Sequence, residues 1–169
     1  MTLQTDIMEV MQPIIGGVVI WLDQNKPRPA LPYSGIKIIS RKRIMRDHYS
    51  NPDDNGIQTV QGDREFTLSV QTYGYDAPTD PLENAANKLQ LETVRDKFQA
   101  KGLVAFDIGA IQDISALLDK TQIEKRANLD IFFRTKINQT DNVGLIETVN
   151  VEGRDNGVGS PVYTIVATT

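Results

Sequence analysis

Apolar and polar residues alternate along several stretches of the chain, and this period of two predicts β-strands. The clearest stretch is residues 65–73, where Phe66, Leu68 and Val70 alternate with polar side chains. Such alternation is typical of a strand that has one face on the core and the other on solvent or on a partner. A second long strand is predicted over residues 128–137, with core-facing positions Leu129, Ile131, Phe133, Thr135 and Ile137.

Shorter apolar runs add further strands. Residues 18–22, 36–44 and 103–108 are rich in β-branched and apolar side chains, which favours extended structure. The single tryptophan, Trp21, lies in the first of these runs and is predicted to belong to the core. Residues 47–56 (DHYSNPDDNG) are dense in turn formers and are predicted to be a surface loop.

The second long strand is followed by a predicted turn and a returning strand. Residues 140–142 (TDN) supply turn chemistry, and the alternation resumes after them. We therefore predict an antiparallel hairpin over residues 128–152. Residues 153–160 form a flexible glycine-rich segment in this interpretation, and residues 161–167 offer a last strand.

Helical spacing is found near the N-terminus. Apolar residues recur every three or four positions through residues 2–15, which predicts a helix that Gly16 and Gly17 then end. One further helical turn is predicted over residues 113–118.

A second main helix is predicted over residues 80–101. Asp80 is a suitable cap, Pro81 suits the first helical position, and Glu83 completes the capping-box spacing. Gly102 is a natural stop. These elements together predict an α+β fold: a mixed, mainly antiparallel sheet with two main helices packed on one face.

A chain of 169 residues fits one domain, which is predicted over residues 1–169. Residues 26–33 (KPRPALPY) contain three prolines ahead of a predicted strand. Proline fixes φ and disfavours helix in the residue before it, so this segment is predicted to be a stiff, extended arm. An arm of that kind suits contact with a neighbouring molecule better than catalysis.

The amino-acid composition excludes several classes of function. The 18 basic and 22 acidic side chains give a net charge of −4, which is unlike the electropositive footprint of a dedicated nucleic-acid binder. The absence of cysteine removes disulfides, thiolate nucleophiles and cysteine-based metal sites. No apolar stretch is long enough to span a membrane and the N-terminus lacks a secretory signal, so a soluble protein made in a cytoplasm is expected, with no membrane partner.

The sequence contains parts of several catalytic and ligand-binding patterns, and none of them is complete. The only histidine, His48, lies in the turn-rich loop, where a solvated residue is favoured over a catalytic base. Residues 51–62 begin like a calcium-binding loop, but position twelve is Gly62 instead of a glutamate. Residues 157–159 (GVG) lack the context of a nucleotide fingerprint. No catalytic, cofactor-binding or metal-binding residue is therefore predicted, and no cofactor.

The basic run Arg41, Lys42 and Arg43, followed by Arg46, is the strongest charge cluster. Because side chains alternate along a strand, Arg41 and Arg43 are predicted to point away from Lys42. A solvated or subunit-facing sheet edge is favoured over phosphate binding.

Two alternative functions stay open at this point. Carboxylates such as Asp130, Asp141, Glu147 and Glu152 could form an acid-base pair, as in a hydrolase that acts on cell-wall glycan. The exposed edge of residues 36–44 could instead serve an adaptor that pairs with a partner strand.

The order of elements, together with particular stretches, resembles one family of proteins from tailed bacteriophages. These stretches are residues 27–29 (PRP), 32–33 (PY), 71–74 (QTYG), 80–101, 124–132 (EKRANLDIF) and 144–147 (GLIE). They resemble the neck or tail-terminator (tail completion) proteins, which close the tail tube where it meets the head.

This resemblance implies a ring-forming protomer, with six copies in a homo-oligomer within the neck of the virion, assembled in the host cytoplasm. The ring would contact the tail tube protein, the head-tail connector and, in a contractile tail, the sheath protein. DNA would pass through its lumen without being read. The subunit interface is then predicted to include Pro27, Arg28, Pro29, Pro32, Tyr33, Arg41, Arg43 and Arg46.

Overall fold

A computed structural model describes residues 2–119 and 122–144 of the chain. The glycine-rich segment 153–160, the last strand 161–167 and most of the returning strand of the predicted hairpin lie outside these residues. The chain divides into two compact units. Unit 1 comprises Met1–Arg46 and Gly62–Ile137, and unit 2 comprises Asp47–Gln61 and Asn138–Thr169. The assignment of residues 1–169 to a single domain stays a prediction.

The main sheet is mixed and mostly antiparallel, as predicted. Its path runs β1-β2-β4-β9-β5, with β3 paired to β4 and β6 paired to β9. β1 and β2 pair in parallel, whereas β2 with β4 and β5 with β9 are antiparallel. The strands are β1 (Val19–Trp21), β2 (Tyr33–Arg43), β3 (His48–Tyr49), β4 (Ile57–Tyr73), β5 (Leu103–Ile108), β6 (Gln112–Asp113) and β9 (Arg126–Asn142).

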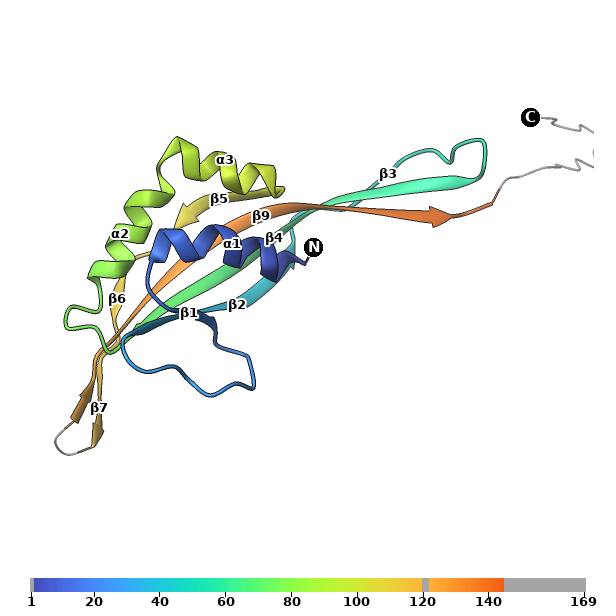
Figure 1. Ribbon diagram of the computed structural model, residues 1–169. Coiled ribbons are helices and arrows are strands. Elements are labelled where there is room, and N and C mark those ends of the chain that lie inside the picture. The colour runs from blue at the N-terminus through green and yellow to red at the C-terminus, as the bar shows by residue number, and fades with distance from the viewer. Residues whose placement is uncertain (1, 120–121, 145–169) are drawn as a thin grey trace, which may run out of the picture. The chain divides into compact units, whose positions relative to one another are not determined.

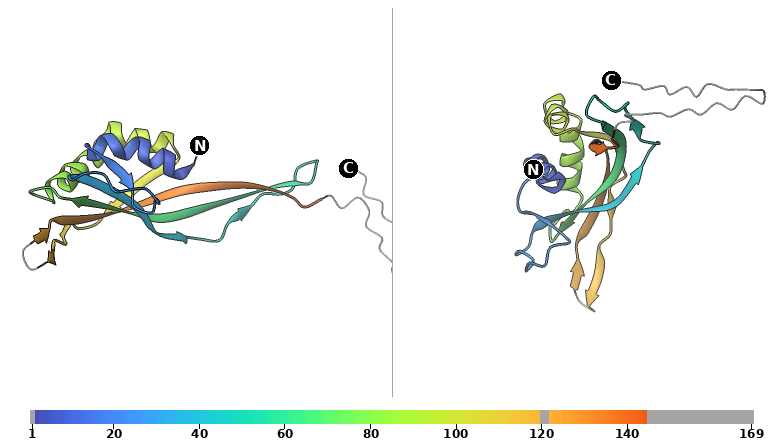
Figure 2. Two further views of the ribbon diagram at one scale, coloured as in Figure 1. Left: turned by 60° about the horizontal axis from the view of Figure 1, so that its bottom comes forward. Right: turned by 90° about the vertical axis from the view of Figure 1, so that its right-hand side faces the viewer.

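A separate two-stranded sheet consists of β7 (Ala116–Asp119) and β8 (Gln122–Glu124). It projects from unit 1 on the side away from the helices (Figures 1 and 2). Leu117 pairs with Ile123 across this small sheet, and both side chains are exposed.

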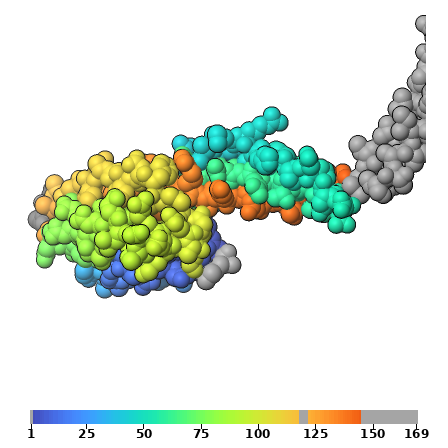
Figure 3. Space-filling view, turned by 90° about the horizontal axis from the view of Figure 1, so that it is seen from above, coloured from blue at the N-terminus to red at the C-terminus, as the bar shows by residue number. Residues whose placement is uncertain are grey.

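The helices of the described residues all lie on one face of the main sheet (Figures 1 and 2). They are α1 (Leu3–Ile15), α2 (Asp80–Leu89) and α3 (Glu92–Ala100). Figure 3 shows their outer surfaces side by side, with α1 in blue and the other two in green to yellow. Thr2 caps α1 through a hydrogen bond from the Thr5 amide to its side chain, and Gly16 ends the helix with φ of 79°.

The core lies between these helices and the sheet. Ile7 and Met11 of α1 are fully buried, as the helical spacing predicted. The Phe133 ring on β9 stacks on that of Phe66 at 5.2 Å and contacts that of Phe98 at 5.1 Å between centroids. Trp21 is buried, which confirms its predicted core position.

The predicted helix over residues 80–101 is wrong as one element, and the sheet face therefore carries three helices instead of two. The chain leaves helical geometry at Leu91, whose φ of −69° and ψ of 135° are extended. The new direction allows Val94 and Phe98 of α3 to reach the core. The predicted capping is wrong as well, because Asp80 lies inside α2 and no side chain caps the preceding Thr79 position.

Two further local predictions are wrong. Residues 113–118 contain no helical turn, because Gln112 and Asp113 pair with β9 and residues 116–119 pair with β8. Residues 140–142 are not a hairpin turn, because β9 continues through Asn142. In both cases backbone pairing within a sheet prevails over local turn or helix preference.

Strand boundaries also differ from prediction at β2 and β4. β2 begins at Tyr33, so the arm is shorter than predicted and its last residue belongs to the sheet. β4 extends back to Ile57, well before residue 65. The strand predicted over residues 103–108 is confirmed with the same bounds as β5.

Unit 2 contains β3 and the first part of β4. His48 pairs with Gln61 and Tyr49 with Val60. In the loop that resembles a calcium site, the Asp53 side chain binds backbone amides of the same loop. Its Oδ1 atom accepts hydrogen bonds from the amides of Asn55 and Ile57 at 2.9 and 2.8 Å. Gly56 has φ of 74°, which suits the end of the tight turn from Asp53, immediately before β4.

Candidate interaction surfaces

The proline arm is partly anchored to the sheet. Pro27, Arg28 and Pro32 are exposed, and Pro29 is half-buried. The Arg28 guanidinium lies 5.9 Å from the centroid of the Tyr73 ring at the end of β4. The arm is therefore non-helical, as predicted, and a cation-π contact ties its exposed part to the strand beside β2.

Tyr33 differs from the rest of the arm, because it is 2% exposed. Its ring stacks on the Tyr73 ring at 4.8 Å with an interplanar angle of 14°. The side chain of Tyr33 thus packs within the protomer. Its role at a subunit interface stays a prediction. In the structure, Tyr33 is the buried residue at the C-terminal end of the arm.

A polar cluster fixes the Tyr73 ring. Its hydroxyl donates to Gln71 Oε1 at 2.6 Å. Arg126 at the start of β9 places its guanidinium 4.8 Å from the ring centroid and donates from Nη2 to Gln71 Oε1 at 3.0 Å. The end of β4, the start of β9 and the arm are thereby held together in unit 1.

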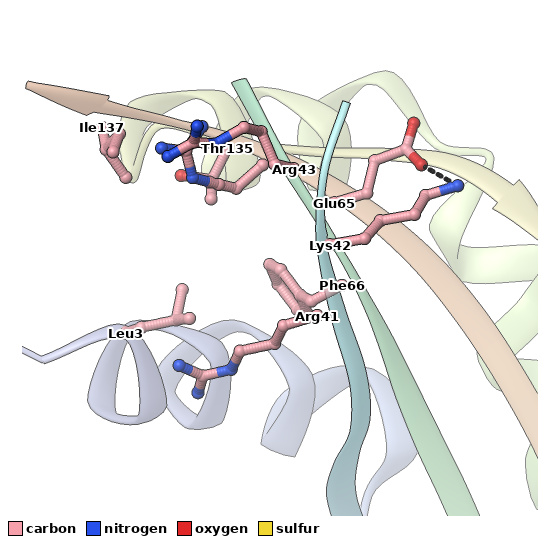
Figure 4. Close-up of a pocket in the computed structure, with 9 residues that line it drawn as sticks. Leu3, Arg41, Lys42, Arg43, Glu65, Phe66, Thr135 and Ile137 are labelled. Carbon is pink, nitrogen blue, oxygen red and sulfur yellow. Dashed lines mark ion pairs between the residues drawn. The ribbon is translucent and has the colours of Figure 1, made fainter. Parts of the chain in front are cut away.

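The basic end of β2 forms the second predicted surface. As predicted, Arg41 and Arg43 point to one side of the strand and Lys42 to the other (Figure 4). Arg41 and Arg43 line a pocket of about 380 Å³ on the side of the sheet that carries α1. Its apolar lining includes Leu3, Phe66 and Ile137.

Lys42 takes part in a charged network on the opposite face, in which one carboxylate pairs with two cations. Its Nζ atom lies 2.7 Å from Glu65 Oε2, and Arg134 Nη2 lies 2.6 Å from Glu65 Oε1. The hydrogen bond from Arg134, and after it that from Lys42, lowers the pKa of Glu65 below its ordinary value of 4.5. Arg134 also lies over the Phe106 ring of β5 at 4.9 Å, so the network crosses four adjacent strands.

One edge of the sheet is open over most of β2. β1 pairs with β2 only at residues 34–36. In the described part of the chain, no strand pairs with the outer edge of residues 37–43. Ile39 lies at a β-bulge in this stretch and is 51% exposed.

The structure does not bring the two predicted groups of interface residues together. Tyr33 begins β2, whereas Arg41 and Arg43 lie at its other end and Arg46 follows it. Seven residues of β2 lie between Tyr33 and Arg41, which corresponds to a separation of about 27 Å at the usual rise per residue. They are two separate surfaces of unit 1.

Sequence reasoning missed the residues that organise these surfaces, namely Glu65, Tyr73, Arg126 and Arg134. The sequence places Glu65 and Tyr73 in the strand predicted over residues 65–73 and assigns neither a role in a surface. The opposition of Lys42 and Glu65 follows from the register of β2 and β4, which no local pattern in the sequence supplies.

The described carboxylates are engaged in structure at several places. Glu65 is paired with two cations, and Asp130 accepts a hydrogen bond from Asn128 Nδ2 at 3.2 Å. Glu147 and Glu152 lie outside the described residues. Among residues 2–119 and 122–144, no group of three or more histidine or acidic side chains is placed to hold a metal ion. No helix within these ranges has the length and apolar character to cross a membrane.

Residues 5–158 match the sequence model of the family described as phage neck terminator protein. The chain belongs to this family. No curated protein sequence matches it. Phage neck terminator proteins are structural, so the chain has a structural role at the tail and neck of the virion, in association with other tail or head proteins. Membership in a structural family also favours a non-enzymatic role over the hydrolase alternative.

Proposed function

We propose that this phage neck terminator protein is the subunit of a ring, with six copies, that closes the tail tube and joins it to the head-side connector. In a contractile tail the same ring would anchor the sheath. Genomic DNA would pass through its lumen without sequence recognition, and assembly would take place in the host cytoplasm.

The observation that carries this proposal is the separation of two unlike surfaces on unit 1. The exposed part of the proline arm lies at one end of β2, and the basic pocket with Arg41 and Arg43 lies at the other. Head-to-tail contacts between unlike surfaces close into a ring when the rotation between neighbours fits. One protomer can therefore offer a different surface to each of its two neighbours.

The net charge of −4 supports the lumen proposal. Tight binding to DNA comes mainly from cations that neutralise phosphates, and this chain has an excess of acidic groups. A ring of such subunits suits passage of DNA better than retention of it.

Native mass spectrometry of the purified chain, and negative-stain images of the chain mixed with tail tubes, test the proposal. We expect a closed oligomer and capped tube ends. A particle that is monomeric at every concentration and never caps tubes would contradict it.

Matched charge reversals test the predicted interface. Arg41→Glu should weaken ring formation, because Arg41 lines the exposed pocket. Lys97→Glu makes the same change of charge on the exposed surface of α3 and should leave the ring intact. Equal effects of both variants would show that net charge, and not this surface, controls assembly.

A further inference from the structure

The open edge of β2 is a ready template for another strand. Residues 37–43 (KIISRKR) pair with β4 on one side, and no described strand occupies the other. An unpaired edge exposes backbone donors and acceptors that a partner strand can satisfy. Ile39, half-exposed on this edge, adds apolar surface beside those groups.

The positive charges of this edge favour a partner strand that carries negative charges. Lys37 and Arg41 are exposed, and neither forms an ion pair within the described part of the chain. Two copies that paired through the same edge would place like charges opposite each other, which is destabilising. An incoming strand that carries carboxylates avoids this repulsion.

The sequence offers such a strand after the last described residue, Gly144. Residues 145–152 (LIETVNVE) combine alternating apolar positions with Glu147 and Glu152, and contain no proline or basic residue. These eight residues are long enough to cover the seven-residue edge. High β-propensity and negative charge are the two properties that the edge requires.

We propose that residues 145–152 of a second copy pair as a strand with residues 37–43 of β2. This inference rests on the proposed function, because it requires that copies of the chain associate. It makes the open edge the acceptor surface of each subunit. The main-chain pairing would supply affinity, and the charges would supply selectivity.

The pocket beside the edge supports this partner. A paired strand lies about 4.8 Å from its neighbour, so its side chains on the α1 side would lie beside those of Arg41 and Arg43. Both guanidinium groups line a pocket that also contains the apolar side chains of Leu3 and Phe66. A strand that presents a carboxylate among apolar side chains fits this mixed lining.

Crosslinking between copies tests the pairing directly, because the chain contains no cysteine of its own. Full-length chains with Ile39→Cys are mixed with chains that carry Thr148→Cys, and a short bis-maleimide is added. We expect covalent dimers of the two variants. The control mixture replaces Ile39→Cys with Thr93→Cys, an exposed position of α3, and should give few dimers.

The outcomes separate the two proposals. Rings that form without enhanced crosslinking at Ile39 would overturn the strand pairing and leave the ring proposal intact. Crosslinking within single chains, in a monomeric variant that carries both cysteines, would also overturn pairing between copies. Chains that stay monomeric and give no crosslink overturn both.

A charge exchange gives an independent test. Glu147→Lys should raise the concentration needed for half assembly by about fivefold, since cross-strand charge pairs contribute up to about 1 kcal/mol each. The matched control Asp141→Lys makes the same change before residue 145 and should have little effect. Adding Arg41→Glu to Glu147→Lys should restore assembly, and no restoration would show that these two positions do not face each other.

Discussion

Arg134 Nη2 on β9 lies 2.6 Å from Glu65 Oε1 on β4, although the two residues are 69 positions apart in the sequence. Glu65 is 9% exposed and is also paired with Lys42 on β2. One carboxylate thus joins three neighbouring strands on the face opposite the helices. A nearly buried charge is tolerated here because it has two cationic partners.

This relationship predicts a pH-dependent stability. The pKa of Glu65 is lower in the folded chain than its ordinary value of 4.5, chiefly because of Arg134. The lowered pKa stabilises the fold above pH 4.5, and this contribution is lost as the pH falls through the folded-state value. Glu65→Gln should therefore lower the melting temperature at pH 7 and narrow its difference from the wild type in acid. A difference that stays constant from pH 7 to pH 3 would contradict this prediction.

The Leu22 side chain lies so close to Gly35 of β2 that a larger residue at position 35 is predicted to destabilise the fold. A Cβ atom at residue 35 would lie 2.2 Å from Leu22 Cδ2 and 2.6 Å from its Cγ. Gly35→Ala should destabilise the fold by about 1–3 kcal/mol, because such overpacking forces a shift of neighbouring atoms. Chemical denaturation measures the change in free energy of unfolding.

The control for this change is a second substitution at the contact. Leu22→Ala removes the atoms that the new methyl group would meet, so the double variant should lose less than the sum of the single losses. Additive losses would show that the clash is relieved elsewhere.

Much of the fold could be predicted from periodicity. The positions of Phe66, Leu68 and Val70 identify the core face of β4, and β5 was predicted with its observed bounds. The break at Leu91 could not be predicted, because neither glycine nor proline marks it and packing of α3 on the sheet decides it. Local preference likewise gave a wrong prediction for residues 113–118, which pair with β9 and β8 instead of forming a helical turn.

The interaction surfaces were less accessible to sequence reasoning. The arm and the basic run around Arg41 were recognised from proline content and charge. The position of Tyr33 inside the protomer depends on its stacking with Tyr73, forty positions away, and on the register between β2 and β4. Such pairings are set by tertiary structure, so no local pattern contains them.

The uncapped start of α3 predicts a stabilising substitution. Leu91 occupies the N-cap position with extended φ and ψ, is 52% exposed, and makes no side-chain capping bond. Leu91→Ser should stabilise the fold by about 1 kcal/mol, because a serine hydroxyl can accept from a free amide of the first turn. Thermal unfolding measures the gain, with Leu91→Ala as the control for loss of the exposed leucine. Equal melting temperatures for the serine and alanine variants would show that no cap forms.

Two substitutions at Tyr73 distinguish the contribution of its ring, which anchors the arm, from that of its hydroxyl, which forms a hydrogen bond. Tyr73→Phe keeps the ring that stacks on Tyr33 and faces Arg28, and loses only the hydroxyl that donates to Gln71. It should cost about 1 kcal/mol of stability and leave the arm in place. Tyr73→Ala removes the ring as well, and loss of a buried aromatic side chain should cost about 3–5 kcal/mol.

Hydrogen exchange of residues 22–34 distinguishes these two variants beyond their stability. We expect faster exchange there in Tyr73→Ala under conditions where the fold is retained, and rates close to wild type in Tyr73→Phe, because the ring provides the surface on which Tyr33 and Arg28 rest. Tyr49→Ala removes a ring that is 52% exposed and serves as the matched control for loss of a tyrosine. If the arm exchanges at the same rate in all three variants, the contacts of Arg28 and Tyr33 with Tyr73 do not hold it, and the proline residues alone must account for its conformation.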